Sequence, residues 1–272
     1  MNYRHAFHAG NFADVLKHAA LAQCLRLMDG PLQIIDTHAG AGVYDLEDGP
    51  AKKSGEAERG IARLAADARA PGAFGPLIKA VRGLNPGGGV RFYPGSPALI
   101  CGLMGKDDRL TACELRPDDF GLLSAWMGRF CPRGAAMQVD GFATAAAQTS
   151  GAGQLLVHID PPFEQPGDYE RCVDTALSVT GRRPGATVMI WLPLKDLETF
   201  DRFLRLLEAR RPPPVLIAEL RLRSLVDPMA MNGCALIILN PPTGLEAELE
   251  VICRWSAQNL GDSGAQSSVW AL

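Results

Sequence analysis

The chain has 272 residues, 47% of them apolar, and carries 27 Lys and Arg against 30 Asp and Glu, a formal net charge of -3 at pH 7. This length suits one large α/β domain or two small ones with a sizeable core. A slightly acidic chain has no overall attraction to nucleic acid or to an anionic membrane, so any RNA or DNA must be bound by a local basic patch.

The opening residues, MNYRHAFHAG, lack the apolar core of a signal peptide. No stretch approaches the roughly eighteen apolar residues that a membrane span needs. We therefore expect a cytoplasmic protein with no membrane contact. The seven cysteines include no C-x-x-C pair, and we expect mostly buried, reduced side chains rather than a zinc site or any other metal site.

A first helix is predicted directly after Asn11, whose side chain can cap it. FADVLKHAALAQCLRLM, residues 12–28, carries an apolar face until Gly30 and Pro31 stop the helix. Four of the five histidines fall at or before His38, among cations and aromatic rings, a mixture that suits an anionic or stacked ligand. An ion pair between His18 and Asp14 along the helix is an equally good explanation of His18.

Short apolar runs then recur along the chain and predict the strands of one sheet. Several are apolar almost throughout, which is typical of parallel strands covered by helices on both faces. The predicted fold class is therefore α/β, with an open, doubly wound sheet. The seven runs are residues 32–36, 110–115, 135–140, 155–160, 187–192, 215–220 and 235–240.

The interval between the first two runs is too long for a single crossover helix. It holds two helical patterns, GEAERGIARLAADAR and FGPLIKAVRGLN, separated by Pro71 and Gly72. We interpret residues 47–93 as a helical subdomain inserted into a single domain that spans residues 1–272.

A glycine turn, IIDTHAGAG, follows the first run directly. Gly40 and Gly42 would let the backbone approach a ligand closely and present N–H groups to it, although a plain tight turn explains them as well. Glu114 closes the second run, where a carboxylate can accept both ribose hydroxyls of a nucleoside cofactor. Taken alone, an acid in that position is more often a surface residue.

Two further positions have both a ligand interpretation and a structural one. Asp140 and Gly141 close the third run, where they could lie beside the adenine ring of the same cofactor or simply form a turn. Ser96 follows a Pro-Gly turn in FYPGSP, where it could contact the ligand or cap a helix.

The fourth run ends in LLVHIDPPF, residues 155–163, and places an acid at the carboxyl end of a strand, where open α/β sheets bind ligands. The prolines remove backbone donors and stop the chain from continuing as helix or ladder. The Asp160 carboxylate and the Pro161 carbonyl then suit the N–H groups of an exocyclic amine, with Phe163 stacked on its base. A methyl group could pass from a sulfonium to that amine, provided that the base is single-stranded or flipped out.

ALIILNPPT, residues 235–243, repeats the strand-then-prolines pattern with Asn240 in place of the acid. It lacks the aromatic residue and falls on the predicted last strand. We assign this second motif to chain termination.

Together these motifs resemble the ribosomal RNA large-subunit methyltransferase J family. The similarity rests on YRHAFHAGNFADVLKH, DTHAGAG, YPGSP, ELRPDDF, VDGF and DPPF, and it extends in order over nearly the whole chain. It implies a Rossmann-like class I methyltransferase fold with an inserted helical subdomain. It also implies S-adenosyl-L-methionine as cofactor and methylation of N6 of an adenine in 23S rRNA.

Carried over by motif, the resemblance implies that Asp160 is the catalytic acceptor and that Tyr3 approaches the RNA. It assigns cofactor contacts to His18, His38, Ser96, Glu114, Asp140 and Gly141, beside the Gly40 of the glycine turn. The chain departs from the family at Phe163, where tyrosine is common, and also at Phe12 and Thr243.

The main hypothesis is thus a monomeric enzyme that methylates 23S rRNA as free RNA rather than in the assembled ribosome. One alternative, a DNA adenine amino-methyltransferase, is weakened because no separate target-recognition domain is visible. The other is a non-catalytic RNA-binding protein with a vestigial methyltransferase fold, which the unremarkable charge disfavours. The candidate RNA patches, each equally well explained as solvated surface, are Arg4 with Lys17, Arg182 with Arg183, Arg210 with Arg211, and Arg221 with Arg223.

Overall fold

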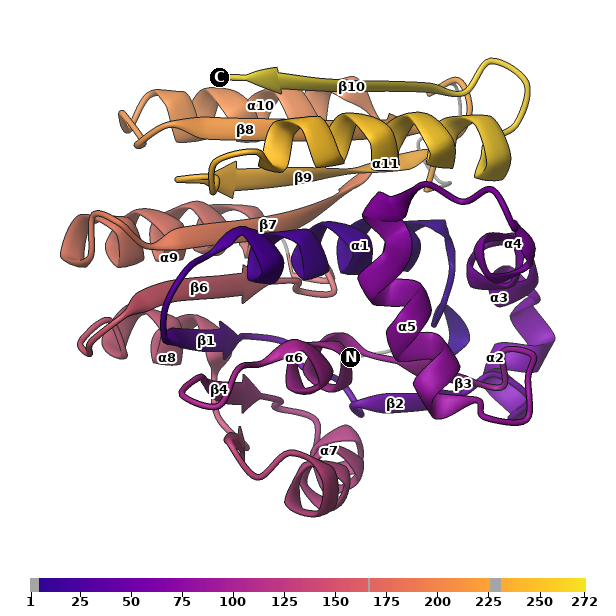
Figure 1. The fold of residues 1–272 in the computed structure, drawn as a ribbon. Helices are drawn as coiled ribbons and strands as arrows, with labels where there is room; N and C mark the ends of the chain where they lie inside the picture. Colours follow the sequence, from indigo (N-terminus) through magenta and orange to yellow (C-terminus); the bar gives the residue numbers. More distant parts are fainter. Residues whose placement is uncertain (1–4, 166, 226–230) are drawn as a thin grey trace.

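The computed structural model describes residues 5–165, 167–225 and 231–272. Its centre is an eight-stranded sheet in the order β10-β8-β9-β7-β6-β1-β4-β5 (Figure 1). The strands are β1 (Leu32–Asp36), β4 (Arg109–Cys113), β5 (Gly134–Met137), β6 (Gln154–Ile159), β7 (Thr187–Leu194), β8 (Val215–Arg221), β9 (Gly233–Leu239) and β10 (Gln266–Ala271).

Each of the seven predicted runs forms a strand of this sheet, which confirms the α/β fold class. The strands from β5 through β4, β1 and β6 to β7 are parallel. β9 lies antiparallel between β7 and β8, a direction that the apolar runs did not reveal. β10, which the sequence analysis missed, is a largely exposed edge strand antiparallel to β8.

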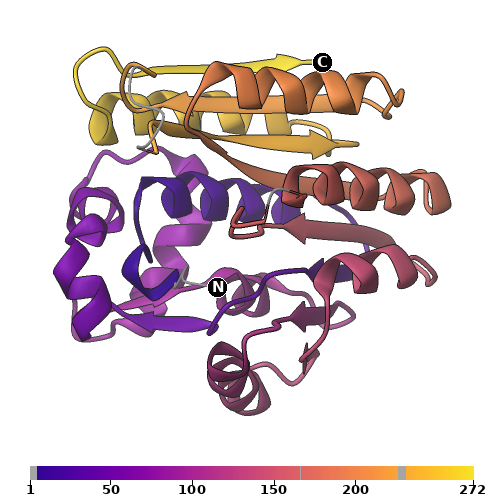
Figure 2. The same ribbon diagram turned by 180° about the vertical axis from the view of Figure 1, so that it is seen from behind.

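Helices cover both faces of the sheet, as Figures 1 and 2 show from opposite sides. Each face buries its own apolar cluster, so the near-continuous apolar strands are explained by burial on both sides. One layer holds α1 (Phe12–Leu27), α6 (Ser96–Leu103), α7 (Pro117–Phe130) and α11 (Leu245–Leu260), and the other holds α8 (Gly141–Ala147), α9 (Asp168–Arg182) and α10 (Leu197–Glu208).

Helix α1 begins where the sequence predicts, because the Asn11 side chain accepts hydrogen bonds from the backbone N–H groups of Ala13 and Asp14 at 2.9 and 3.0 Å. Its burial is more extensive than one apolar face suggests. Every residue from 13 to 25 is buried, since the helix packs between the sheet and the neighbouring helices α5 (Gly75–Leu84), α6 and α11. Polar side chains of α1 are therefore forced to find partners inside the protein.

The segment from 47 to 93 is largely helical and lies beyond the carboxyl ends of the parallel strands (Figures 1 and 2). It is flanked by two short strands that pair antiparallel, and its interpretation as an inserted subdomain stays a prediction. The elements are β2 (Val43–Asp45), α2 (Gly49–Ser54), α3 (Glu56–Arg59), α4 (Ile61–Ala66), η2 (Gly72–Phe74), α5 (Gly75–Leu84) and β3 (Phe92–Pro94).

This segment contacts the residues that lead into α1, which follow the short helix η1 (His5–Phe7). The backbone N–H of Ile61 donates to the Gly10 carbonyl at 2.8 Å. The Glu56 carboxylate accepts from the Asn11 amide at 2.9 Å and lies 3.0 Å from His8 Nδ1. The start of α1 is thus held by the 47–93 segment.

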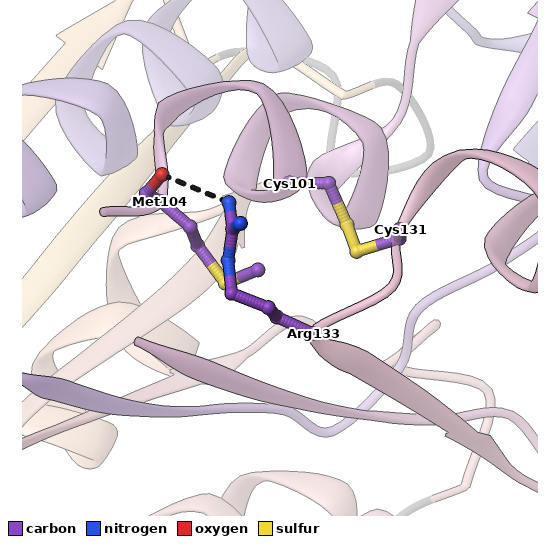
Figure 3. The surroundings of a disulfide bond; sticks show 4 residues. All are labelled: Cys101, Met104, Cys131 and Arg133. Carbon is purple, nitrogen blue, oxygen red and sulfur yellow. Dashed lines mark hydrogen bonds between the residues drawn. A yellow bond between two sulfur atoms is a disulfide. The ribbon is translucent and has the colours of Figure 1, made fainter. Parts of the chain in front are cut away.

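Cys101 of α6 and Cys131, which follows α7, form a disulfide with their Cα atoms 5.7 Å apart (Figure 3). The expectation of reduced cysteines is wrong for this pair. The two are 30 positions apart in the sequence, and only the tertiary fold brings the end of α7 to α6 within bonding distance. The other five cysteines are buried thiols.

No helix in the described ranges is long and apolar enough to cross a membrane. Within the same ranges, no group of three or more His, Cys, Asp or Glu side chains is arranged to hold a metal ion.

Candidate active site

The predicted site residues come together at the carboxyl edge of the parallel strands. β1 and β6 are neighbours at the centre of the sheet, and the chain proceeds from β1 to one side and from β6 to the other. Such a switch in direction leaves a crevice at the strand ends, where open α/β sheets bind ligands. Gly40, Glu114, Asp140 and Asp160 each follow one of the four strands β1, β4, β5 and β6.

Asp160, the predicted catalytic acceptor, is in contact with Lys17 of α1. The Lys17 Nζ lies 2.5 Å from the Asp160 Oδ2 and 2.9 Å from the Asp14 Oδ1. Burial opposes the charge on Lys17, but the two carboxylates outweigh burial and raise its pKa. Lys17 is therefore an ammonium at neutral pH that fixes one Asp160 oxygen.

Asp14 completes this charged group inside α1. It accepts a hydrogen bond from the Gly10 N–H at 2.9 Å and lies 3.1 Å from His5 Nε2. Burial opposes its charge, but His5 and Lys17 hold the pKa of Asp14 well below its usual value. The prediction that Lys17 belongs to a surface patch is wrong, because Lys17 is buried. Its position one turn after Asp14 is the sequence signal for this ion pair.

His18 is buried, and its ring has a different partner from the one considered in the sequence. Its Nδ1 lies 2.7 Å from the Tyr93 hydroxyl, and the two rings stack with centroids 5.5 Å apart. Burial holds the pKa of His18 well below 6.5, so the ring is neutral at pH 7. The alternative of a helix ion pair with Asp14 is therefore wrong, because Asp14 pairs with Lys17 and His5.

His38 lies between the glycine turn and α8. Its Nδ1 is 2.8 Å from the Thr37 hydroxyl, and its ring meets the Phe142 ring edge-on at 4.8 Å. Burial lowers the pKa of His38 to about 4. Beneath it, the fully buried pair of Asp36 and His158 joins β1 to β6, with His158 Nδ1 3.1 Å from Asp36 Oδ1.

The glycine turn is braced against Glu114. Gly40 and Gly42 have φ values of 61° and 85°, in the left-handed region that favours glycine. The Gly40 N–H donates to one Glu114 oxygen at 2.9 Å, and the Arg116 N–H donates to the other at 2.8 Å. Burial raises the pKa of Glu114, and each of its oxygens keeps a lone pair for a further donor.

Asp140 and Gly141 each have a structural role at the start of α8. The Asp140 carboxylate accepts from the Ala143 N–H at 3.0 Å and pairs with Arg171 at 2.6 Å. A side chain on Gly141 would overlap the backbone of Thr37, so this glycine allows the ends of β5 and β1 to approach. Both residues therefore lie beside the glycine turn.

Ser96 is the first residue of α6 and is buried. The prediction that it caps this helix is wrong: the N-cap is Gly95, which has no side chain. Gly95 takes that place because its N–H donates to the Gly42 carbonyl at 2.8 Å, and a Cβ there would lie 2.9 Å from the same oxygen.

Phe163 adopts a backbone conformation that is unusual for an aromatic residue, with φ of 51°. Its ring contacts the Tyr169 ring at 4.7 Å and the Trp191 ring at 6.0 Å between centroids. Strained conformations of this kind gather at functional sites. The predicted RNA contact Tyr3, like Arg4, lies outside the described residues.

The second strand-then-prolines motif lies at the opposite edge of the sheet. β9 is antiparallel to β7, so Asn240 emerges where the parallel strands begin. Its amide donates to the Pro184 and Ala186 carbonyls at 2.8 and 2.9 Å. These bonds support its assignment to chain termination.

Most of the candidate RNA arginines are engaged within the protein. Arg182 and Arg183 donate to backbone carbonyls, among them those of Ala146 and Thr149. Arg210 and Arg223 form surface ion pairs with Asp174 and Asp262. Arg221 pairs with the buried Glu219 carboxylate. These ion pairs leave fewer free cations than the sequence suggests.

Comparison with known proteins finds similarity to one family of ribosomal RNA methyltransferases over nearly the whole chain. A sequence model of the family "Ribosomal RNA large subunit methyltransferase D, RlmJ" matches residues 29–272. Two relatives carry the name "Ribosomal RNA large subunit methyltransferase J". The one from Escherichia coli is 33% identical over 97% of this chain and 95% of its own. The one from Haemophilus influenzae is 32% identical over 98% and 96%.

A crystal structure of a protein from Legionella pneumophila superposes with a TM-score of 0.89 and is 27% identical, covering 97% of this chain and 98% of that one. The sheet order and the family match together establish the Rossmann-like class I methyltransferase fold. S-adenosylmethionine is the cofactor of such enzymes. The chain therefore belongs to the RlmJ family of ribosomal RNA large-subunit methyltransferases.

Proposed function

We propose that this protein transfers a methyl group from S-adenosylmethionine to N6 of a single adenine in 23S rRNA, with Asp160 as the catalytic acceptor. One observation carries the proposal. Asp160 stands at the switch point of the sheet, held by the Lys17 ammonium at 2.5 Å, and is followed by two prolines and the strained Phe163. The names of the two bacterial relatives support an RNA of the large ribosomal subunit as substrate.

The residues around the glycine turn fit a nucleoside cofactor. The Glu114 carboxylate follows β4 beside Gly40, where it can accept hydrogen bonds from the ribose hydroxyls. Gly40 and Gly95 have no room for a side chain, because a Cβ would overlap the Tyr44 hydroxyl in the first case and lie 2.9 Å from the Gly42 carbonyl oxygen in the second. The cofactor supplies the methyl group, which it carries on a sulfonium. We assign contacts with it to His18, His38, Gly40, Ser96, Glu114, Asp140 and Gly141.

On the target side, the chain supplies acceptors for an amine. The exocyclic nitrogen of adenine is a weak nucleophile because its lone pair is delocalised into the ring. Hydrogen bonds from its N–H groups to the Asp160 carboxylate and the Pro161 carbonyl draw it towards tetrahedral geometry. As the N–C bond forms, the bond between the methyl carbon and sulfur breaks and leaves a neutral thioether. The amine then loses one proton, for which the Asp160 carboxylate is the adjacent base, a role worth about 10²- to 10⁴-fold in rate.

The substrate must present the adenine outside a helix to reach this crevice. We assign contacts with the base to Phe163 and contacts with the RNA to Tyr3. We further propose that a monomer acts on free 23S rRNA rather than on the assembled ribosome.

The test is methyl transfer from labelled S-adenosylmethionine to 23S rRNA from a strain that lacks this gene, followed by nucleoside mass spectrometry. Wild-type protein is expected to form N6-methyladenosine, and Asp160→Ala to form none. Asn240→Ala is the matched control, because it changes the other strand-then-prolines motif at the far edge of the sheet.

Two results would contradict the proposal. Full activity of Asp160→Ala would remove the mechanism. Absence of product with wild-type protein that binds the cofactor in calorimetry would remove the substrate and direct the search to DNA or another amine.

A further inference from the structure

The order of the strands separates the two partners of the reaction at Asp160. The residues assigned to the cofactor after β1, β4 and β5 all lie on one side of β6, the strand that ends at Asp160. β7 lies on its other side. Methyl donor and target amine must meet near Asp160 from opposite directions for an in-line transfer. The target base therefore approaches over the end of β7.

The residue at that place is Trp191. β6 and β7 are parallel with Ile159 opposite Ile190, so Trp191 is the neighbour of Asp160 one residue further along. Paired residues of adjacent strands project to the same face of a sheet. Lys17 contacts both side chains, with its Nζ 2.5 Å from Asp160 Oδ2 and 5.8 Å from the centre of the Trp191 ring.

The surroundings of Trp191 leave a supported and accessible ring. Trp191 is half-buried rather than enclosed. The Phe163 ring packs against it at 6.0 Å, Tyr169 packs against Phe163 at 4.7 Å, and Phe203 meets Tyr169 at 6.4 Å. The buried Phe203 ring thus supports a row of three partly exposed rings that ends at Trp191.

We propose that Trp191 is the surface on which the flipped target base stacks, an inference that rests on the proposed base-methylating function. Base stacking on an aromatic ring is favourable for any base, and the large indole face suits a purine. The Lys17 ammonium lies beside the Trp191 ring and binds one Asp160 oxygen. The other Asp160 oxygen can then accept from the target amine. Phe163, to which the sequence analysis gave the stacking role, supports Trp191 from the side.

The test compares Trp191→Leu and Trp191→Phe with Trp270→Leu. Trp270 is the matched control, because it is also a half-buried tryptophan on a strand but lies on β10, at the far edge of the sheet. The substrate is an unmethylated 23S rRNA fragment that contains the target adenine, whose position is first mapped by mass spectrometry of the methylated product. Trp191→Leu is expected to raise the KM for this RNA by about 5- to 150-fold, the worth of one stacked base. Trp191→Phe should stay within a few-fold of wild type.

Two further readouts separate stacking from a merely structural effect. Calorimetry should show the same affinity for S-adenosylmethionine in Trp191→Leu as in wild type. Fluorescence of 2-aminopurine, placed at the target position and measured with saturating protein, should stay quenched by the Trp191 ring in wild type and be brighter with Trp191→Leu. If Trp191→Leu does not fold, a variant in which Trp126, Trp255 and Trp270 are phenylalanine reports stacking directly, as quenching of Trp191 emission by the RNA.

An unchanged KM and an unchanged 2-aminopurine signal in Trp191→Leu would overturn the inference, and so would an equal loss in Trp270→Leu. Absence of quenching in the single-tryptophan protein would do the same. These outcomes differ from failure of the proposed function, in which wild-type protein forms no methylated adenine at all.

Discussion

At the scale of single residues, the candidate site is built from charges that the fold removes from water. Lys17 is only 4% exposed, and Asp14 and His18 are each 1% exposed. A buried ion is tolerated where partners compensate its lost hydration, as Asp14 and Asp160 do for Lys17. His18 differs, because burial holds its pKa well below 6.5 and so keeps the ring neutral.

The buried His18 and the half-buried His38 make the protein sensitive to acid. Burial lowers the pKa of His38 to about 4 and that of His18 well below 6.5. The unfolded chain takes up protons near pH 6.5 and the folded chain does not, so the free energy of unfolding falls as the pH drops from 6.5 towards 4. Urea unfolding at about pH 7.5, 6 and 4.5 should show a flatter decline in His38→Gln.

His8 gives a control of opposite sign. The Glu56 carboxylate raises the pKa of His8 above 6.5, so this pair stabilises the protein fully below the unfolded value and the stabilisation is lost as the pH rises through the folded pKa. His8→Gln should therefore lose stability near pH 6 and little near pH 9. A decline in His38→Gln as steep as in wild type would show that His38 does not cause the acid sensitivity.

At the scale of elements, the contact between the 47–93 segment and the start of α1 decides where Lys17 lies. A Cβ on Gly60 would overlap the Gly10 carbonyl oxygen and come within 2.9 Å of the Asn11 Cα. Gly60→Ala is therefore expected to lower the free energy of unfolding by about 1–3 kcal/mol and to reduce methyl transfer, since the displaced helix carries Lys17. Denaturant unfolding and the methylation assay check both effects.

Gly72→Ala is the matched control in the same segment, because nothing lies within 4 Å of a Cβ at that position. It should be close to wild type in both measurements. Equal losses in the two variants would mean that the 47–93 segment tolerates no added methyl group, rather than that Gly60 touches α1.

The elements themselves were predictable to different degrees. The central strands could be predicted because a strand buried on both faces needs apolar residues at nearly every position. β10 could not be predicted in this way, since QSSVWA is largely exposed and forms a strand only because it pairs with β8. The reversed direction of β9 was equally hidden, because a buried strand has the same apolar composition whichever way it runs.

At the scale of the whole molecule, the residues that we assign to the cofactor follow strands far apart in the sequence, so a ligand bound there should stabilise the entire fold. S-adenosylmethionine at about 100 times its Kd should raise the free energy of unfolding by about 2.7 kcal/mol. Glu114→Ala is expected to lose this increment, because Glu114 is assigned to the ribose. Thermal unfolding of each protein with and without the cofactor measures it.

Asp174→Ala is the matched control, because its carboxylate pairs with the exposed Arg210 and not with the crevice. It should keep the full cofactor-dependent shift. A full shift in Glu114→Ala would show that Glu114 does not hold the cofactor.

The sequence by itself determined the fold class, seven of the eight strands of the central sheet and the motif residues that follow them. These are local properties: a buried strand needs apolar residues, a left-handed turn needs glycine, and a strand end needs a residue that stops it. The family resemblance could be recognised for the same reason, since its motifs are short and contiguous.

The tertiary structure alone decided which distant side chains share the site. Lys17 and Asp160 are 143 residues apart, and Trp191 reaches them only because β7 pairs with β6. The disulfide between Cys101 and Cys131 depends in the same way on α6 lying near α7. Such contacts arise from the packing of whole elements, and a single sequence carries no local pattern that marks them.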